Sequence, residues 1–423
     1  MTRINAGKFF QKKVQMRHHT HRIFCILLGV CLWFLTSCVS SDFLPPQDGD
    51  HRLLGTTRFL LDDPRGLVIQ AWYPATDFGS GRIDPIIQLE QGEAYFKPFP
   101  ISREQLENRL ISSSYVDARV EEGPHPVIIF DHGYEGFEKQ NMSQMEELAS
   151  HGYIVFAVNH PGESFVTLYP DGSVQTIDSD RYPSLRGRTG RERRYRRDLT
   201  TTYFDLFREQ KDDGVVVASM RQFSSYAHVR LMELPIRERT QDIVNLLHQL
   251  SQLNEEGQFA GTLDLDRVGL YGHSMGGNVC IDVASLENLP VNLRAIANLD
   301  GPYLLFPQAP IRIPKVPLLM AYSTGSYTGA FDVNLSECND WILRASDETD
   351  LRVIFHGSTH ANFSDLTYIE ILRDRITGDI DGHDMGMALE KLLVAWFDEH
   401  LKDIPMDFNQ LKASYPLWEM DFR

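Results

Sequence analysis

The sequence predicts an α/β fold in which a mostly parallel central sheet carries helices on both faces. Short, almost wholly apolar runs at 127–130 (VIIF) and 153–158 (YIVFAV) have the length and composition of strands that are buried on both sides. Between them, residues 141–151 have helical spacing, and Gly152 stands where such a helix would stop. Strands that alternate with helices along the chain are typical of a parallel sheet.

The same alternation extends in both directions from this pair of strands. A strand is expected earlier, at 67–73 (LVIQAWY), and an amphipathic helix later, at 240–253, where the apolar residues share one face. Further strands are expected at 268–271, 293–299, 317–322 and 351–355, and a last helix at 385–401. The sequence shows no internal repeat.

Composition excludes several classes of protein. Of 423 residues, 42% are apolar and 23% are charged, which excludes a largely disordered chain, a collagen-like fibre and a coiled-coil rod. The net charge of −17 argues against nucleic acid as a partner, because such binding depends on clustered positive charge. Five cysteines are too few for a disulfide scaffold, and there is no Cys-x-x-Cys pair to suggest zinc.

The first 37 residues have the features of a secretory signal peptide. They contain six basic and no acidic residues, and an apolar run at 23–35 is too short to span a bilayer. The run leads into Leu35-Thr36-Ser37-Cys38, which resembles the bacterial lipobox, whose cysteine is lipidated. Because Val39 rather than Asp follows, the resemblance implies a lipid-anchored protein of the cell envelope, sorted to the outer membrane. An ordinary signal peptide or an uncleaved anchor is the alternative.

The rest of the chain divides into a tether, one domain and a tail. Length alone would admit two or three domains, but the signal segment and one insertion leave a single core. The predicted boundaries are 38–50 for the tether, 51–405 for the domain with an insertion at about 165–237, and 406–423 for the tail.

An arginine cluster between Arg186 and Arg197 lies within the insertion. We interpret this insertion as a lid-like segment whose arginines are solvated and pair with acidic groups. A phosphate- or RNA-binding patch and a contact with anionic lipid headgroups are the alternatives.

A G-x-S-x-G pattern around Ser274 points to nucleophilic catalysis. The string Gly272-His273-Ser274-Met275-Gly276 joins the strand 268–271 to an apolar, helix-like stretch, as a nucleophile elbow requires. The two glycines allow the backbones to pass closely, and the helix N-terminus adds positive potential. The sequence therefore predicts an α/β-hydrolase fold with Ser274 as the nucleophile.

A base and an orienting acid should follow the serine, in the order Ser, Asp or Glu, His. His360 lies just after the strand 351–355, at the edge of the sheet where active-site loops gather. The other histidines beyond the serine are less suitable: His356 would be packed, and His383 and His400 would lie on the surface.

Asp300 is the best candidate for the acid because it closes the strand 293–299. Asp332 follows a polar loop after the next strand, and Asp365 could be a turn residue. The alternative for Asp300 itself is a turn-forming Asp before Gly-Pro. The oxyanion hole needs two backbone N–H groups. We expect Met275 to supply one and Tyr134, in the loop 131–136, to supply the other.

At this point the chain resembles the platelet-activating factor acetylhydrolase family of α/β-hydrolases. The resemblance rests on FDHGYEGF with LASHGYIVFAVNH, VGLYGHSMGG, AIANLDG and IFHGSTHANFSDLTY, in this order. It covers about residues 50–405 and is weak between 165 and 235. The resemblance implies a triad of Ser274, Asp300 and His360, with Tyr134 and Met275 as oxyanion donors.

Two departures leave the substrate open. Gly301-Pro302 follow Asp300 where animal members have a small residue and a tryptophan, and Tyr134-Glu135 replace a small apolar pair. The implied activity is hydrolysis of short or oxidised acyl chains from phospholipids or related esters, without a metal or organic cofactor. Alternatives are a general carboxylesterase, a cutinase or polyesterase, which GHSMGG also resembles, and a non-catalytic lipid-binding lipoprotein.

Cys280 is expected to be a buried thiol, although pairing with Cys338 is possible in an oxidising compartment. The sequence gives no indication of the oligomeric state.

Overall fold

The computed structural model describes residues 47–85, 112–183, 189–210, 212–324, 336–346, 349–368, 376–416 and 418–422. The signal segment 1–37, Cys38 and most of the expected tether lie outside these ranges. None of the helices within them is both long and apolar enough to cross a membrane.

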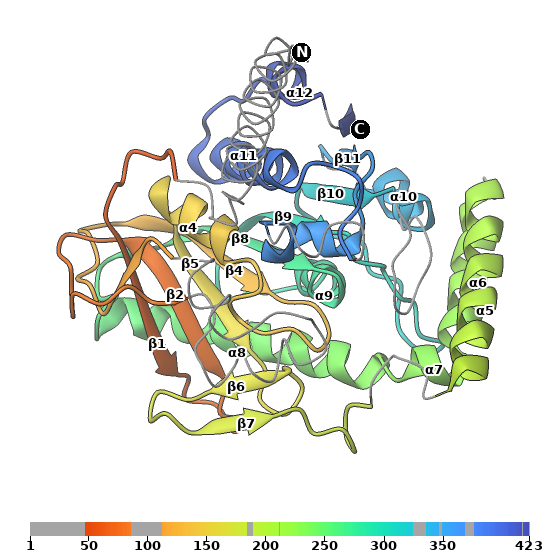
Figure 1. Cartoon of the computed structure of the whole chain (residues 1–423), viewed down its shortest axis with the longest axis horizontal. Coiled ribbons are helices and arrows are strands. Elements are labelled where there is room, and N and C mark those ends of the chain that lie inside the picture. Colours follow the sequence, from red (N-terminus) through yellow and green to blue (C-terminus); the bar gives the residue numbers. More distant parts are fainter. Residues whose placement is uncertain are drawn as a thin grey trace, which may run out of the picture. The chain divides into compact units, whose positions relative to one another are not determined.

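A ten-stranded sheet forms the centre of the domain, in the order β12-β11-β10-β9-β8-β4-β5-β2-β1-β3 (Figure 1). Its strands are β1 (Leu54–Leu60), β2 (Val68–Pro74), β3 (Ser114–Val116), β4 (His125–Asp131), β5 (Ile154–Asn159), β8 (Leu263–His273), β9 (Leu293–Leu299), β10 (Leu318–Ser323), β11 (Leu351–Phe355) and β12 (Trp418–Phe422). The six strands from β5 to β11 are mutually parallel, as predicted, whereas β2 and β12 join them antiparallel.

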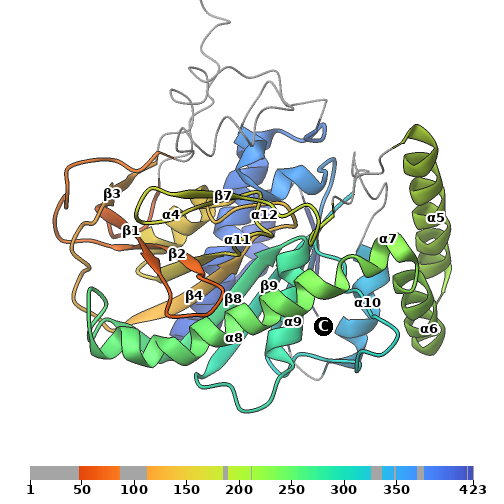
Figure 2. The ribbon, with the colours of Figure 1, turned by 90° about the horizontal axis from the view of Figure 1, so that it is seen from below.

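Helices cover both faces of this sheet. On one face lie α4 (Met142–Ser150) and α11 (Gly382–Lys402), and on the other α8 (Glu233–Glu255) and α9 (Met275–Ala284) (Figure 2). Alternate residues of each strand point into the two hydrophobic cores. For example, Ile129 packs in the core beneath α8, and Ile128 packs in the core beneath α4. The fold is therefore the predicted α/β-hydrolase type, with a core on each side of the sheet.

The insertion contains a hairpin and a pair of helices. Its hairpin is β6 (Val166–Leu168) with β7 (Val174–Thr176), and its helices are α5 (Gly190–Glu209), α6 (Asp213–Ser224) and α7 (Ala227–Arg230). Helices α5 and α6 lie side by side and contact α10 (Ser336–Ala345). In both views, α7 lies between this pair of helices and α8 (Figures 1 and 2). Helix α8 begins at Glu233, about two turns before its expected start at 240, because Pro235 is tolerated in a first helical turn.

The two ends of the domain differ from the predicted boundaries. Residues 47–50, which were assigned to the tether, lie against α4, where the Gly49 N–H donates to the Ser150 hydroxyl at 3.2 Å. The expected tail forms α12 (Phe408–Ser414) and β12, so the sheet continues past residue 405. An unpaired edge on β11 is the physical reason, because β12 satisfies its backbone groups.

Candidate functional site

Ser274 occupies a strained turn between β8 and α9. Its backbone has φ 58° and ψ −118°, a region that costs free energy for any residue with a side chain. The Ser274 N–H donates to the Leu299 carbonyl at 2.9 Å, which fixes the turn to β9. A Cβ atom on Gly276 would lie 2.0 Å from the Asp131 carbonyl oxygen, so only glycine allows this close approach. The local sequence therefore forms the predicted elbow.

Asp300 and His360 meet at the same edge of the sheet. Asp300 follows β9 with φ 53° and is 1% exposed, and His360 begins a short 3₁₀ helix, η1 (His360–Phe363), beyond β11. The Nδ1 atom of His360 lies 2.8 Å from Oδ2 of Asp300. This contact brings together the two residues predicted as acid and base, and the region of the alternative Asp332 lies outside the described residues.

Ser323, at the end of β10, holds the Asp300 carboxylate from the other side. Its N–H donates to Oδ1 of Asp300 at 2.9 Å, and its hydroxyl donates to Oδ2 at 3.0 Å. The carboxylate thus has fixed donors besides the imidazole, which restricts its orientation. Ser323 was not predicted from the sequence, although its position at a strand end on the site edge was a usable signal.

Gln140 and His273 connect three loops of the site. The Gly133 N–H donates to Oε1 of Gln140 at 3.3 Å, and Nε2 of Gln140 lies 2.5 Å from Nδ1 of His273. Nε2 of His273 lies 3.1 Å from the backbone carbonyl of His360. Burial and the neighbouring His360 hold the pKa of His273 well below its usual value, so the ring is neutral. A neutral ring with its proton on Nε2 satisfies both contacts.

The two expected oxyanion donors flank Ser274. Met275 is the first residue of α9, whose leading N–H groups have no partner within the helix. Gly133, which precedes Tyr134, lies so close that a Cβ atom there would be 3.3 Å from Cβ of Ser274. The Tyr134 hydroxyl donates to the Pro183 carbonyl at 3.2 Å, which directs the side chain toward the insertion.

Gly301, which follows Asp300, is a glycine for a steric reason. A Cβ atom on Gly301 would lie 2.2 Å from the Ser274 carbonyl oxygen, and the Gly301 N–H donates to the Asn298 side chain at 2.8 Å. The small residue at this position is therefore required by its contact with the elbow. Nothing in the structure explains Pro302.

Several other predicted residues have different surroundings. Asp365, which was considered as a turn residue, begins the short 3₁₀ helix η2 (Asp365–Tyr368) and is buried. It accepts hydrogen bonds from the Ser143 N–H at 3.1 Å and hydroxyl at 2.6 Å. His356, expected to be packed, is exposed and lies 3.7 Å from Glu419. Cys280 is a free, buried thiol, as predicted.

The arginine cluster lies partly on α5. Arg191 and Arg194 are exposed, and Arg196 pairs with Glu192 one turn earlier. These positions agree with a solvated helix face. The other members, and the side chain of Cys338, fall outside what the structure describes.

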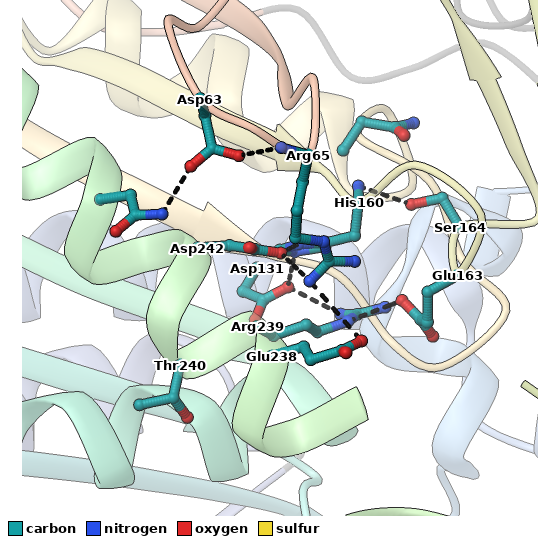
Figure 3. Close-up of polar contacts among 12 residues, drawn as sticks. Asp63, Arg65, Asp131, His160, Glu163, Ser164, Glu238, Arg239, Thr240 and Asp242 are labelled. Carbon is teal, nitrogen blue, oxygen red and sulfur yellow. Dashed lines mark hydrogen bonds and ion pairs between the residues drawn. The ribbon is translucent and has the colours of Figure 1, made fainter. Parts of the chain in front are cut away.

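A buried ionic cluster behind the elbow was not foreseen. Arg239 on α8 contacts Asp131 and Glu163, and His160 lies between Asp131 and Asp242 (Figure 3). One signal for it was present in the sequence: Arg239 is a charged residue in line with the apolar face of α8.

One group of side chains has the spacing of metal ligands. Asp48, Glu147 and His151 bring their ligand atoms within 4.8 Å of one another in the described part of the chain. The Lys391 ammonium ion already lies between both carboxylates, 2.5 Å from Glu147. This arrangement is an ion-pair cluster that joins the segment before β1, the end of α4 and α11.

Comparison with known proteins agrees with this arrangement. A sequence model of the family "Platelet-activating factor acetylhydrolase, isoform II" matches residues 104–419. Platelet-activating factor acetylhydrolase of Bos taurus is 26% identical over 296 residues, 68% of this chain and 59% of the relative. The enzyme of Cavia porcellus is 25% identical over 290 residues, with the same shares, and that of Gallus gallus is 22% identical over 292 residues, 68% of this chain and 64% of the relative.

The match thus spans about three fifths of the length of these relatives. A ferulic acid esterase from Streptomyces cinnamoneus has a similar fold, with a TM-score of 0.62 and 19% identity over 90% of this chain and 99% of that one. At that identity the likeness concerns the fold alone. The family match covers most of the chain, including the elbow, the acid and the histidine loop. The chain therefore belongs to the platelet-activating factor acetylhydrolase, isoform II, family.

Proposed function

We propose that this chain hydrolyses carboxylic esters through an acyl-enzyme formed on Ser274. The observation that carries the proposal is the contact between His360 and Asp300, 2.8 Å long, beside a serine on a strained elbow. His360 and the elbow are adjacent, because the rings of His273 and His360 are 4.4 Å apart between centroids. The residues that we propose as nucleophile, base and orienting acid thus lie at one edge of the sheet, which supports the proposal.

The proposed reaction has two steps. Oγ of Ser274 attacks the ester carbonyl while Nε2 of His360 takes its proton, and Asp300 stabilises the imidazolium through Nδ1. The N–H groups of Tyr134 and Met275 bind the oxyanion. The imidazolium then returns the proton to the departing alcohol, and water, activated by the same base, releases the acid and regenerates the serine.

The serine is the direct test of this function. We expect Ser274→Ala to fold normally and to lower kcat on p-nitrophenyl butyrate by about 10³-fold or more. A fluorophosphonate probe should label the wild type and not the variant, whereas a lipid-binding protein without catalysis would not be labelled at all. Activity that survives the substitution nearly intact would refute the proposal.

Short acyl chains on phospholipids are the substrate class that we propose. Support comes from the family and from the names of its relatives, which are platelet-activating factor acetylhydrolases. We expect 1-alkyl-2-acetylglycerophosphocholine to be hydrolysed faster than its 2-palmitoyl analogue, and p-nitrophenyl acetate faster than the palmitate. Equal rates along both series would instead favour a general carboxylesterase.

We also propose that Cys38 carries a lipid that anchors the protein in the bacterial envelope, at the outer membrane. The support is the sequence itself: a basic segment, an apolar run and a lipobox-like Leu35-Thr36-Ser37-Cys38 in direct succession. An anchored enzyme would meet its phospholipid substrates at the membrane surface.

A further inference from the structure

Arg239 lies directly behind the loop that would form the oxyanion hole. It projects from α8 toward the end of β4, and its side chain is only 1% exposed (Figure 3). A buried guanidinium is stable only when its charge and its N–H groups are paired. The groups that pair with Arg239 therefore indicate its role in the site.

Two carboxylates compensate the charge of Arg239. Nη1 donates to Oδ1 of Asp131 at 2.7 Å, and Nε donates to Oε2 of Glu163 at 2.7 Å. Burial alone would lower the pKa of Arg239, but Glu163 and Asp131 raise it above its ordinary value. His160 lies against the same Oδ1 atom of Asp131, at 3.0 Å. Arg239 is thus a fixed cation within a dry cluster.

The remaining donors of Arg239 hold backbone carbonyl groups. Nη1 donates to the His132 carbonyl at 2.5 Å, and Nη2 donates to the Gly133 carbonyl at 3.2 Å. The Gly133 carbonyl also accepts from Nδ1 of His132 at 2.7 Å and from the Gly136 N–H at 2.9 Å. Three donors on one carbonyl oxygen restrict the rotation of its peptide group.

The state of His132 agrees with this role. Burial and the nearby Arg239 hold its pKa well below the usual value, so the ring is neutral. Nε2 lies 2.8 Å from the Ser164 hydroxyl, which can donate to it. We assign the single ring proton to Nδ1 because the Gly133 carbonyl, 2.7 Å away, can only accept; Nη2 of Arg239, 3.1 Å from Nδ1, then donates to Glu163 and Gly133 instead.

We propose that Arg239 and His132 are positioning residues that aim the N–H group of Tyr134 at the developing oxyanion. The carbonyl of Gly133 and the N–H of Tyr134 belong to one planar, trans peptide group, so they point in opposite directions. Fixing the carbonyl toward Arg239 therefore fixes the N–H on the other side of the loop. Preorganised donors of this kind avoid reorganisation when charge develops. The inference rests on the proposed esterase function.

The variant Arg239→Lys tests the inference, because lysine keeps the charge but cannot reach both carboxylates and both carbonyls. We expect kcat on p-nitrophenyl butyrate to fall about 10- to 100-fold, a part of the loss caused by removing an oxyanion donor outright. KM should change less than about threefold. The inhibition constant of a trifluoromethyl ketone, whose adduct with Ser274 carries an oxyanion, should rise in parallel with the loss of kcat/KM.

Arg352→Lys is the matched control. Arg352 is also a nearly buried arginine; it lies on β11 and pairs with Asp340 at 2.9 Å and with Asp421 of β12 at 3.4 Å. We expect this variant to lower the melting temperature without changing kcat or the ketone affinity. If Arg239→Lys behaves like Arg352→Lys, or raises only KM, its role is structural and the inference is wrong.

A pair of substitutions at His132 gives an independent test. This test decides the question even when the Arg239→Lys variant fails to fold. His132→Asn retains a donor near the position of Nδ1, whereas His132→Leu removes it. We expect the leucine variant to lose kcat and ketone affinity together and the asparagine variant to retain most of both. Equal values for the two would contradict the inference. The inference alone fails if Arg239→Lys and His132→Leu keep the wild-type kcat and ketone affinity while activity still depends on Ser274. The proposed function itself fails if Ser274→Ala remains active.

Discussion

Gln140 links three parts of the site: the Gly133 loop, His273 and, through His273, the His360 loop. Its amide accepts from the Gly133 N–H and contacts Nδ1 of His273, which in turn contacts the His360 loop. Removing this amide leaves a buried ring nitrogen and a backbone N–H without partners, which costs free energy in the folded state and loosens three loops at once.

We therefore expect Gln140→Leu to lower kcat for p-nitrophenyl butyrate by about tenfold or more, with a smaller change in KM. Steady-state kinetics give both values. Gln258→Leu is the control, because Gln258 binds the Tyr73 hydroxyl at 2.5 Å near the opposite edge of the sheet. A Gln140 variant that is indistinguishable from the Gln258 variant in kcat would contradict the role of this bridge.

A buried carboxyl on α11 should make stability depend on pH. Burial raises the pKa of Glu390 from 4.5 to about 8, and that of the nearby Asp365 from 3.8 to about 7. Between about pH 4.5 and 8 the folded state keeps the Glu390 proton that the unfolded chain releases. Stability from this group is therefore complete at low pH and is lost as the pH rises through about 8.

The variant Glu390→Gln should remove this dependence, because an amide stays neutral and its oxygen can still accept from the Tyr368 hydroxyl, now 2.7 Å away. We expect the melting temperature of the variant to fall less between pH 5 and pH 8.5 than that of the wild type. Glu255→Gln, at an exposed position on α8, should leave the wild-type profile unchanged. Parallel profiles for Glu390→Gln and the wild type would refute the assignment.

At the scale of elements, β12 completes the sheet beside the strand that leads to His360. Trp418 pairs with Phe355 across the two strands, is 4% exposed, and its ring lies 5.1 Å from the Phe355 ring. These residues were predicted to form a tail, because a five-residue strand after a short helix has no strong periodic pattern. Pairing with the β11 edge, not local propensity, decides its conformation.

We expect Trp418→Ala to lower the free energy of unfolding by about 3–5 kcal/mol, as for other buried aromatic residues. Urea unfolding followed by tryptophan fluorescence or circular dichroism measures this change. Glu419→Ala, on the same strand but about half exposed, should change it by less than about 0.5 kcal/mol. A similar small effect at both positions would show that β12 contributes little to the fold.

At the scale of the whole molecule, the proposed anchor and the catalytic domain should be separable. We expect Cys38→Ser to move the full chain from the membrane pellet to the supernatant in cell fractionation and to abolish labelling by palmitate. The kcat on p-nitrophenyl butyrate should not change, because the described site residues all lie between 131 and 365. Retention of the variant in the pellet would indicate an uncleaved anchor instead.

The sequence by itself determined those features that depend on local pattern. Continuous apolar runs identify the buried strands β4, β5 and β8 to β11, since parallel strands covered on both faces need no alternation. The glycines around Ser274 identify the elbow, because only they permit its close approaches. Asp300 and His360 follow strand ends, and their meeting at one edge follows from parallel topology.

Only the tertiary structure decided the features that depend on distant partners. Strand β1 (LGTTRFL) has no continuous apolar run, and its place is fixed by pairing with β2 and β3. The roles of Arg239, Gln140 and Ser323 were not predictable from the sequence, because each acts through groups from other elements. A single polar residue on an otherwise apolar face is common in protein sequences and does not by itself indicate a function. It acquires a role only when folding excludes water around it and leaves specific partners as its sole source of hydrogen bonds.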